Sequence, residues 1–260
     1  MADTPLIEVR NVGKRFGNII ALADVSFKAY RGEVHALLGD NGAGKSTLIK
    51  TLSGVHEPTQ GEILIDGRPV HFTSPRAAAA AGIGTVYQDL ALVPLMSVTR
   101  NFFMGREIRK GAGPLRWLDM PQMAAIAKAE MAKLGIDVAD PNQPIGTMSG
   151  GQRQTLAIAR AVYFGANVLI LDEPTSALGQ KQQLEVLRMI RRVHDHSDVA
   201  IILITHNDLH AKLIANRFTF LSRGRVIGAG TADELKGEEI RTLMAGGAEL
   251  AELEREFAAA

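Results

Sequence analysis

Residues 39–46 read GDNGAGKS, which fits the phosphate-binding pattern G-x-x-x-x-G-K-[ST]. A short apolar run over residues 34–38 precedes this stretch, and a helical pattern over residues 45–54 follows it. Glycines let backbone N–H groups wrap around phosphates, and the helix that follows points its positive end at them. The expected phosphate-binding residues are Gly39, Asp40, Asn41, Gly42, Ala43, Gly44, Lys45, Ser46 and Thr47. The stretch therefore predicts a phosphate-loop fold that binds a nucleoside triphosphate.

Four side chains carry the expected chemistry, two in the phosphate-binding stretch and two far downstream in the sequence. Lys45 supplies a positive charge that reaches the β and γ phosphates, and Ser46 offers its hydroxyl to Mg²⁺. Far downstream, Asp172 ends the apolar run over residues 168–171, a position that faces the metal in phosphate-loop folds. Glu173 comes next and can orient the attacking water and accept its proton. A pair of acids at a strand end is weak evidence alone, but it becomes strong beside a phosphate loop.

A second glycine-containing stretch opens a predicted helix. It consists of Ser149, Gly150, Gly151 and Gln152. Ser149 is the expected N-cap, and the two glycines expose backbone N–H groups, so this helix start predicts a second anion site. From these residues alone, a simple capped helix start remains the alternative.

Apolar runs alternate with helical patterns along the chain, which favours an α/β fold with a mainly parallel sheet. Strands are expected at residues 6–9, 24–30, 34–38, 62–65, 83–87, 168–172 and 200–205. A helix is expected over residues 180–194, and a late hairpin over residues 218–222 and 226–229. The whole chain, residues 1–260, is interpreted as one domain.

The middle of the chain has a different pattern. Residues from about 90 to 164 show helical patterns broken by Gly and Pro, with no convincing strand. The clearest helix is predicted over residues 120–134. This indicates a helical subdomain inserted in the α/β core. The tail from about residue 231 to 260 is predicted to be helical as well.

Composition excludes several classes of protein. The net charge is +1, so no basic field argues for nucleic acid, and the chain is 46% hydrophobic and 22% charged, as in ordinary globular proteins. The absence of cysteine excludes disulfides, thiolate metal sites and cysteine nucleophiles. We expect no secretion signal at the N-terminus, and no apolar run approaches the ~20 residues that span a bilayer.

Together, the phosphate loop, the SGGQ stretch and the LILDE stretch over residues 169–173 resemble the ATP-binding subunits of ABC transporters, over nearly the whole chain. The resemblance implies an ABC-type phosphate-loop core with an antiparallel β subdomain and an inserted helical subdomain. The family has Leu-Ser-Gly-Gly-Gln where this chain has Met148 before Ser149. In the family this segment binds the γ phosphate held by a second subunit, which implies a head-to-tail dimer with two ATPs between its subunits.

The resemblance also assigns roles to single residues. Gln88 matches the glutamine that senses Mg²⁺ or water, so the implied metal residues are Ser46, Gln88 and Asp172. His206 matches the histidine that contacts the γ phosphate, which makes Glu173, His206 and Gln88 the implied catalytic set. Phe16 matches the aromatic residue that stacks on adenine, although the sequence alone favours an ordinary apolar role. His206 and His210 have the i, i+4 spacing of a metal pair, but His206 directly follows a strand, which argues against one continuous helix.

One position departs from the family. After residues 174–178, where the family usually places Asp, this chain has Gly179. That Asp contacts the opposite subunit's phosphate loop and helps to set the attacking water. Its absence leaves Glu173 and His206 in place, so hydrolysis is still predicted, with weaker coupling between the two sites.

Residues 70–75, 82–94 and 101–107 resemble the bacterial monosaccharide importers, the class that takes up ribose, xylose and fructose. Most ATPases of that class are two fused domains, whereas this chain is a single domain, as in the fructose branch. The resemblance implies ATP and Mg²⁺ as cofactors, integral membrane permease subunits and a periplasmic sugar-binding protein as partners, and the cytoplasmic face of the inner membrane as location. Fructose is the first expectation for the sugar, with ribose and mannose next. A soluble ABC ATPase without a permease, such as one of iron–sulfur cluster assembly, is the alternative.

Overall fold

The computed structural model describes residues 4–113 and 115–244. The chain divides into two compact units. Unit 1 comprises the described residues of Met1–Thr85, Ala166–Glu173 and His194–Ala260, and unit 2 comprises those of Val86–Gly165 and Pro174–Val193. Among the described residues, no helix is long and apolar enough to cross a membrane.

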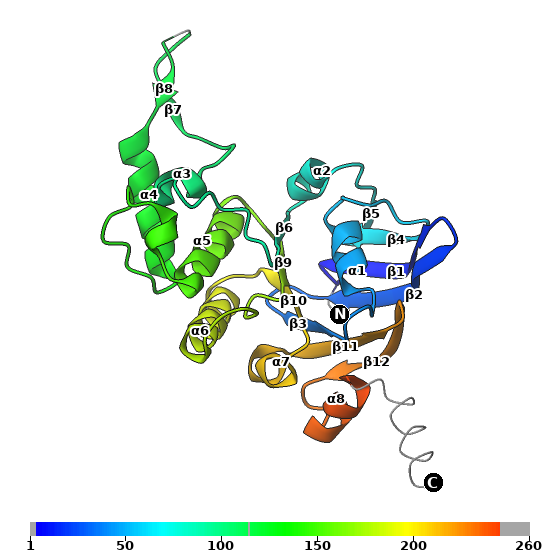
Figure 1. The fold of residues 1–260 in the computed structure, drawn as a ribbon. Helices are drawn as coiled ribbons and strands as arrows, with labels where there is room; N and C mark the ends of the chain where they lie inside the picture. Colours follow the sequence, from blue (N-terminus) through cyan, green and yellow to red (C-terminus); the bar gives the residue numbers. More distant parts are fainter. Residues whose placement is uncertain (1–3, 114, 245–260) are drawn as a thin grey trace, which may run out of the picture. The chain divides into compact units, whose positions relative to one another are not determined.

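Unit 1 is built on two sheets (Figure 1). An antiparallel sheet has the order β2-β1-β4-β5, and a six-stranded sheet has the order β12-β11-β3-β10-β9-β6. The strands of the first sheet are β1 (Ile7–Phe16), β2 (Ile19–Ala29), β4 (Gln60–Ile65) and β5 (Arg68–Val70). Those of the second are β3 (Val34–Leu38), β6 (Ile83–Val86), β9 (Val168–Asp172), β10 (Ala200–Thr205), β11 (Arg217–Ser222) and β12 (Arg225–Thr231). The helices are α1 (Lys45–Leu52), α2 (Pro75–Ala80), α7 (Asp208–Ile214) and α8 (Gly237–Met244).

The centre of the six-stranded sheet confirms the predicted α/β class. Strands β9, β10, β3 and β11 run parallel to one another, and every residue of β3 and β10 is buried. Continuous runs of Val, Ile and Leu form such strands because both faces of a parallel sheet are covered. Since the strands are parallel, their carboxyl ends lie at one edge, where the phosphate loop and the acidic pair follow β3 and β9.

The first two strands are longer than the sequence pattern predicts. β1 continues to Phe16 instead of ending near Val9, and β2 begins at Ile19 instead of residue 24. The register of β1 against β2 shifts between Val9 and Val12, where Asn11 has a φ of 50°. A bulge of this kind interrupts the alternation of buried and exposed residues, so a search for strict alternation stops too early.

The late hairpin is confirmed as β11 and β12, which pair antiparallel around Arg223 and Gly224. Both turn residues have positive φ, 44° and 74°, as the turns that suit a hairpin's twist require. The expected helical tail begins later than predicted, because β12 continues to Thr231 and α8 starts only at Gly237. The rest of that prediction, residues 245–260, lies outside the described residues.

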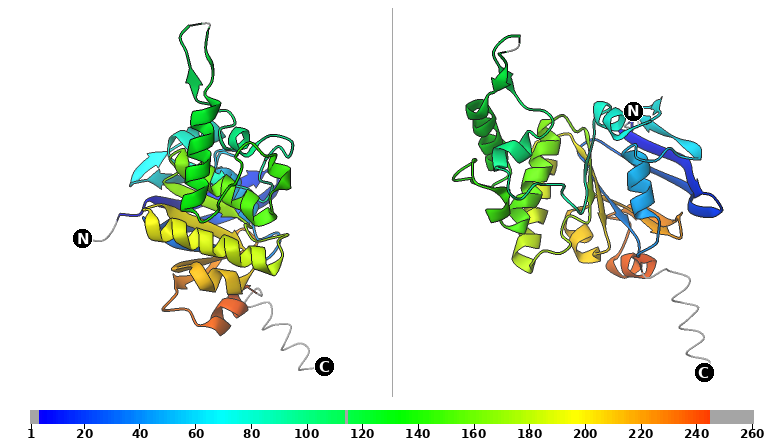
Figure 2. Two further views of the ribbon diagram at one scale, coloured as in Figure 1. Left: turned by 90° about the vertical axis from the view of Figure 1, so that its left-hand side faces the viewer. Right: turned by 45° about the horizontal axis from the view of Figure 1, so that its top comes forward.

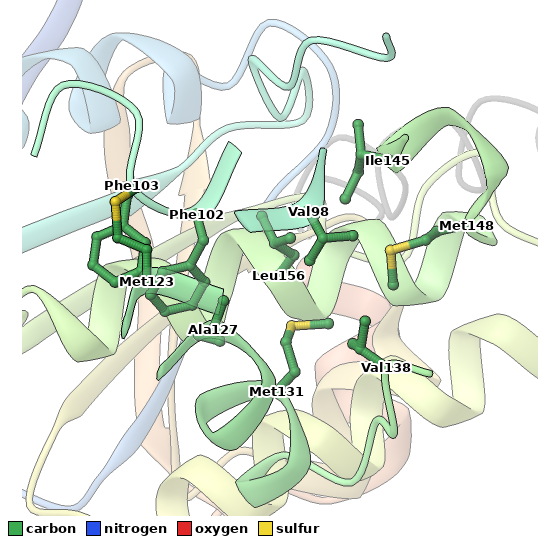
Figure 3. Close-up of a cluster of buried hydrophobic side chains, with 11 residues drawn as sticks. Val98, Phe102, Phe103, Met123, Ala127, Met131, Val138, Ile145, Met148 and Leu156 are labelled. Atoms are coloured by element: carbon green, nitrogen blue, oxygen red, sulfur yellow. The ribbon is translucent and has the colours of Figure 1, made fainter. Parts of the chain in front are cut away.

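Unit 2 is mainly helical. It contains α3 (Val98–Phe102), α4 (Met120–Lys133), the 3₁₀ turn η1 (Ile145–Thr147), α5 (Gly150–Tyr163) and the first part of α6 (Gln180–His196). The helices pack on a core of Phe, Met, Val, Ile, Leu and Ala side chains (Figure 3). Met148 is part of this core. Its thioether occupies a buried apolar position that Leu fills in the family, which explains why the exchange is tolerated.

A short hairpin corrects the prediction that residues 90–164 hold no strand. β7 (Arg109–Lys110) pairs antiparallel with β8 (Trp117–Leu118). Each strand has only two residues, so neither produces a readable alternation of polar and apolar side chains. In Figures 1 and 2 the hairpin extends beyond the helices of unit 2.

Candidate active site

The phosphate loop connects β3 to α1 within unit 1. Gly39 has a φ of 152°, and a Cβ on it would lie 2.3 Å from the backbone oxygen of Leu221. Gly44 is the N-cap of α1, with a φ of 102°, and provides no side-chain cap for the helix. The N–H groups of the first turn of α1 therefore have no capping side chain, which suits an anion. The glycines thus fit the role predicted for them.

Lys45 is buried, with 8% of its surface exposed. Its ammonium donates to the backbone oxygens of Gly39 at 2.6 Å and Asp40 at 2.9 Å. Burial lowers the pKa of Lys45, while the nearby charges of Glu173, Asp40 and Asp172 raise it. The loop thus holds a desolvated cation against its own backbone oxygens. The electrostatic attraction between this cation and a phosphate group would be strong in such a desolvated position.

Asp172 is the last residue of β9, as predicted, and lies opposite Ile204 of β10 in the parallel register. Burial raises the pKa of its carboxyl above the ordinary value, and the charge of Glu173 raises it further, whereas Lys45 and Lys50 lower it. The net effect of this environment disfavours the charged form of the carboxyl. An added cation would therefore be favoured here.

Glu173 has a backbone conformation that the sequence does not reveal. Its φ is 47°, in the left-handed region that is unfavourable for a residue with a side chain. Its N–H donates to the backbone oxygen of Ile204 at 2.9 Å, which fixes the turn after β9. Backbone strain at a polar residue of this kind is typical of a functional position.

The carboxylate of Glu173 is held at one oxygen by the last residue of β10 and at the other by the residue that follows β10. The hydroxyl of Thr205 donates to Oε2 at 3.3 Å, and Nδ1 of His206 lies 2.8 Å from Oε1. A carboxylate only accepts, so Nδ1 carries the proton, which in the neutral ring leaves Nε2 as an acceptor. His206 is 63% exposed, whereas Glu173 is 13% exposed. Sequence reasoning named both residues but missed their contact and the part played by Thr205.

The remaining predicted residues of unit 1 lie on α1, at the end of β1 and before α7. Ser46 is exposed in the first turn of α1, where Thr47 follows it. Phe16 ends β1 and is 43% exposed; its ring meets His56 edge-on at 5.1 Å between centroids. The ammonium of Lys14 lies over the same ring, 5.1 Å from its centroid, so the ring is exposed but has two neighbours. His206 lies before α7, which confirms that it shares no helix with His210.

In unit 2 the SGGQ stretch forms the start of α5. Ser149 is the N-cap: its Oγ accepts from the N–H of Gln152 at 3.2 Å, and Oε1 of Gln152 accepts from the N–H of Ser149 at 2.9 Å. This reciprocal capping box occupies both side chains. A Cβ on Gly150 would lie 2.5 Å from a methyl carbon of Leu178, so a larger residue there would require the Leu178 side chain to shift. Sequence reasoning found the cap but not the return bond from Gln152.

Cationic residues accompany this helix start. Ser149 and Gln152 line a cleft of about 510 Å³ with three basic residues of α6, Lys181, Arg188 and Arg192, and with two acidic residues, Asp137 and Glu185. Positive charge beside a glycine-rich helix start supports the predicted anion site. Gln88 is exposed and also belongs to unit 2. The phosphate loop belongs to unit 1, so the joint action of Gln88 and the SGGQ stretch at a nucleotide remains a prediction.

Known proteins that resemble this chain identify its family. A family model described as "ABC transporter" matches residues 22–176. The fructose import ATP-binding protein FrcA of Rhizobium meliloti is 45% identical, over 86% of this chain and 88% of its own length. The xylose/arabinose import ATP-binding protein XylG of Sulfolobus acidocaldarius is 41% identical, over 92% and 93%. A ribose import ATP-binding protein of Burkholderia pseudomallei is 40% identical over 93% of this chain, which spans only 47% of that relative.

Solved structures agree in fold. The structure of cbiO1 from Clostridium perfringens, part of an ABC transporter complex, is 26% identical with a TM-score of 0.77, and the match covers 97% of this chain and 100% of that one. A dimeric ATP-binding cassette bound to ADP and phosphate has a TM-score of 0.71 at 24% identity, over 87% and 98%. The import relatives do not favour a soluble ABC ATPase without a permease. The chain therefore belongs to the ABC transporter family, in its class of monosaccharide-import ATP-binding proteins.

Proposed function

We propose that this chain binds ATP with Mg²⁺ and hydrolyses it to power import of a monosaccharide, with fructose as the first candidate, through a membrane permease. The observation that carries the proposal is the Glu173 carboxylate, held by Thr205 and His206 in the same unit as the phosphate loop. The likeness to FrcA supports fructose, and the likeness to the xylose and ribose proteins supports the wider sugar class.

The residues present fit a magnesium ion. Mg²⁺ prefers oxygen ligands, and Asp172 and Ser46 offer a carboxylate and a hydroxyl, with Gln88 as the third expected oxygen donor. Burial and the charge of Glu173 raise the pKa of Asp172 despite Lys45 and Lys50, so a further cation would favour the ionised carboxylate. When bound, the metal would neutralise charge on the phosphates.

The chain's own residues carry the other parts of the reaction. The N-terminus of α1 and Lys45 hold the phosphates through N–H groups and a buried cation. Glu173 accepts a proton from the attacking water, and His206, with Nδ1 held by Glu173, has Nε2 available for the phosphate or the water. The strained backbone of Glu173 fixes the carboxylate before the nucleotide arrives, so little reorganisation is needed during the reaction.

We infer a head-to-tail dimer as the working form, because each chain has one phosphate loop and one SGGQ stretch. A structurally similar cassette that is dimeric with ADP and phosphate supports a dimer. Closure of the dimer on ATP would move the permease, a periplasmic protein would deliver the sugar, and hydrolysis would reset the dimer. Exposed apolar side chains just after Gln88, notably Leu95 at 91% exposure, support a docking surface for the permease at the cytoplasmic side of the inner membrane.

Substitution of Gly179 tests the coupling between the two sites. A Cβ on Gly179 meets no atom within 4 Å, and α6 begins at the next residue, so Asp fits and can act as an N-cap. Gly179→Asp should leave the fold intact and raise the Hill coefficient for ATP in the assembled complex toward its two-site limit of ~2. Identical Hill coefficients for both proteins would count against a role of Gly179 in weak coupling.

Asp172→Asn should raise the stability of the fold while it abolishes the Mg²⁺-dependent reaction. Because the folded-state pKa of Asp172 is raised, its charge opposes folding at neutral pH, and this effect disappears as the pH falls below the ordinary value of 3.8. Without nucleotide and Mg²⁺, the variant should melt roughly 2–4 °C higher at pH 7 and equally near pH 3.5, while Mg²⁺-dependent hydrolysis is lost. Asp198→Asn, at an exposed position, is the control. A lower melting temperature at pH 7 would contradict the argument.

Recovery of partners tests the function as a whole. The tagged chain is purified from detergent-solubilised membranes of its own organism with ATP and Mg²⁺, and the proteins that accompany it are identified by mass spectrometry. We expect a multi-spanning permease, and uptake of labelled fructose that depends on the chain in a deletion strain. Soluble partners alone would refute the importer. Uptake of ribose or xylose instead would refute only the choice of sugar.

A further inference from the structure

The β7–β8 hairpin has a fixed base in unit 2. Ile108 packs against the helical core, and its backbone oxygen accepts from the N–H of Asp119 at 2.8 Å. Asp119 is also the N-cap of α4, accepting from the N–H of Gln122. The hairpin therefore continues directly from an anchored helix, and Figures 1 and 2 show it extending away from α3, α4 and α5.

The far end of the hairpin exposes two large apolar side chains. Leu115 is 73% exposed and Trp117 is 55% exposed. A Cβ on Gly111 would lie 2.1 Å from the backbone oxygen of Leu115 and 3.1 Å from the ring of Trp117, at a φ of 98°. The backbone of Leu115 and the ring of Trp117 therefore approach Gly111 closely, while much of both residues is exposed to solvent. Two large apolar side chains exposed on one short hairpin are a candidate interaction site.

Basic residues surround these apolar side chains. Residues 108–118 read IRKGAGPLRWL, with three basic residues and no acidic one. Arg109, Lys110 and Arg116 are all exposed. Lys110 has a long contact of 3.4 Å with Asp119 at the base. Just before the segment, hydrogen bonds from the backbone N–H groups of Glu107 itself and of Gly105 lower the pKa of the Glu107 carboxyl. The exposed end is therefore positively charged.

We propose that this hairpin binds the membrane surface directly, with Arg109, Lys110 and Arg116 on anionic lipid headgroups and Trp117 and Leu115 at the interface. Tryptophan favours the headgroup level of a bilayer, and basic residues there are drawn to anionic lipids. A stable protein interface buries about 800 Å² on each partner, which two apolar side chains on a narrow hairpin do not supply. The proposal adds a lipid contact to the permease docking above and needs no nucleotide chemistry.

The chain offers its own probe, because Trp117 is its single tryptophan. The full-length protein is mixed with vesicles of phosphatidylcholine containing about one third phosphatidylglycerol, and with vesicles of phosphatidylcholine alone. We expect a blue shift of the tryptophan emission and quenching by brominated acyl chains with the anionic vesicles only. Salt should reverse both effects, since exposed charges are screened over about 8 Å at physiological ionic strength and over less at higher salt.

Matched variants separate the hairpin from general charge. Charge reversal of the hairpin residues (Arg109→Glu, Lys110→Glu, Arg116→Glu) should lower co-sedimentation with anionic vesicles by about tenfold or more. The same charge change at exposed residues away from the hairpin (Arg68→Glu, Arg76→Glu, Lys128→Glu) should have little effect. Trp117→Ala should also weaken sedimentation. Circular dichroism checks the fold of every variant.

Three results would overturn the proposal. The first is an emission spectrum unchanged by anionic vesicles. The second is equal loss of sedimentation in the hairpin and control reversals. The third is a blue shift of the Trp117 emission that appears only when the permease is present, and that also appears in detergent without lipid. The partner of the hairpin would then be a protein. Because vesicles contain no permease, failure here leaves the importer assignment untouched, and failure of the partner recovery leaves this test valid.

Discussion

Glu173→Gln should lower ATP turnover by about a thousandfold while leaving ATP binding close to that of the wild type. The amide keeps the size of the side chain, and its oxygen can still accept from Thr205, but it cannot take the proton of the attacking water. Because ATP stays bound, the closed dimer should accumulate. Steady-state phosphate release, an equilibrium ATP titration and size-exclusion chromatography with ATP and Mg²⁺ measure these three effects.

Two controls make the result specific. Glu57→Gln removes an exposed carboxylate elsewhere in unit 1 and should hydrolyse ATP at the wild-type rate. Glu173→Asp keeps the carboxylate but shortens it, so the contact with Nδ1 of His206, now 2.8 Å, would lengthen. We expect its rate to lie between those of the wild type and Glu173→Gln. A Glu173→Gln enzyme as fast as the wild type would place the base at another residue.

The sequence predicted the parts of the site that local geometry determines. The phosphate loop, Asp172 at the end of β9 and Ser149 as an N-cap each depend on a few neighbouring residues and on the element that precedes or follows them. Their residue types at those spacings allow few other structures. Such features can be predicted from one sequence because the residues that determine each of them are close neighbours along the chain.

Other features depend on contacts between distant residues. The left-handed backbone of Glu173 is fixed by Ile204, and its carboxylate by Thr205 and His206, more than 30 positions along the chain. No local pattern at Glu173 indicates positive φ, since the residue type is unfavourable there. The β7–β8 hairpin was missed for another reason: Gly111 permits the crossing, but the strands are too short to show alternation.

Lys45→Ala should weaken ATP binding by about a hundredfold or more, because the variant lacks the buried cation that meets the β and γ phosphates. Burial lowers the pKa of Lys45, so its charge is poorly solvated before ATP binds. A triphosphate would supply the opposite charge in a region of low dielectric constant, where attraction is strongest. Titration calorimetry with ATP and Mg²⁺ measures the loss of affinity.

Loss of affinity must be separated from damage to the loop. The ammonium of Lys45 also holds the backbone oxygens of Gly39 and Asp40, so its removal can loosen the loop without any nucleotide. Lys45→Arg keeps the charge but not the compact shape, and Lys50→Ala removes an exposed charge from the same helix. If charge and position both matter, Lys45→Arg should bind ATP weakly and Lys50→Ala nearly normally. Unchanged binding in Lys45→Ala, with a melting temperature near that of the wild type, would remove Lys45 from the site.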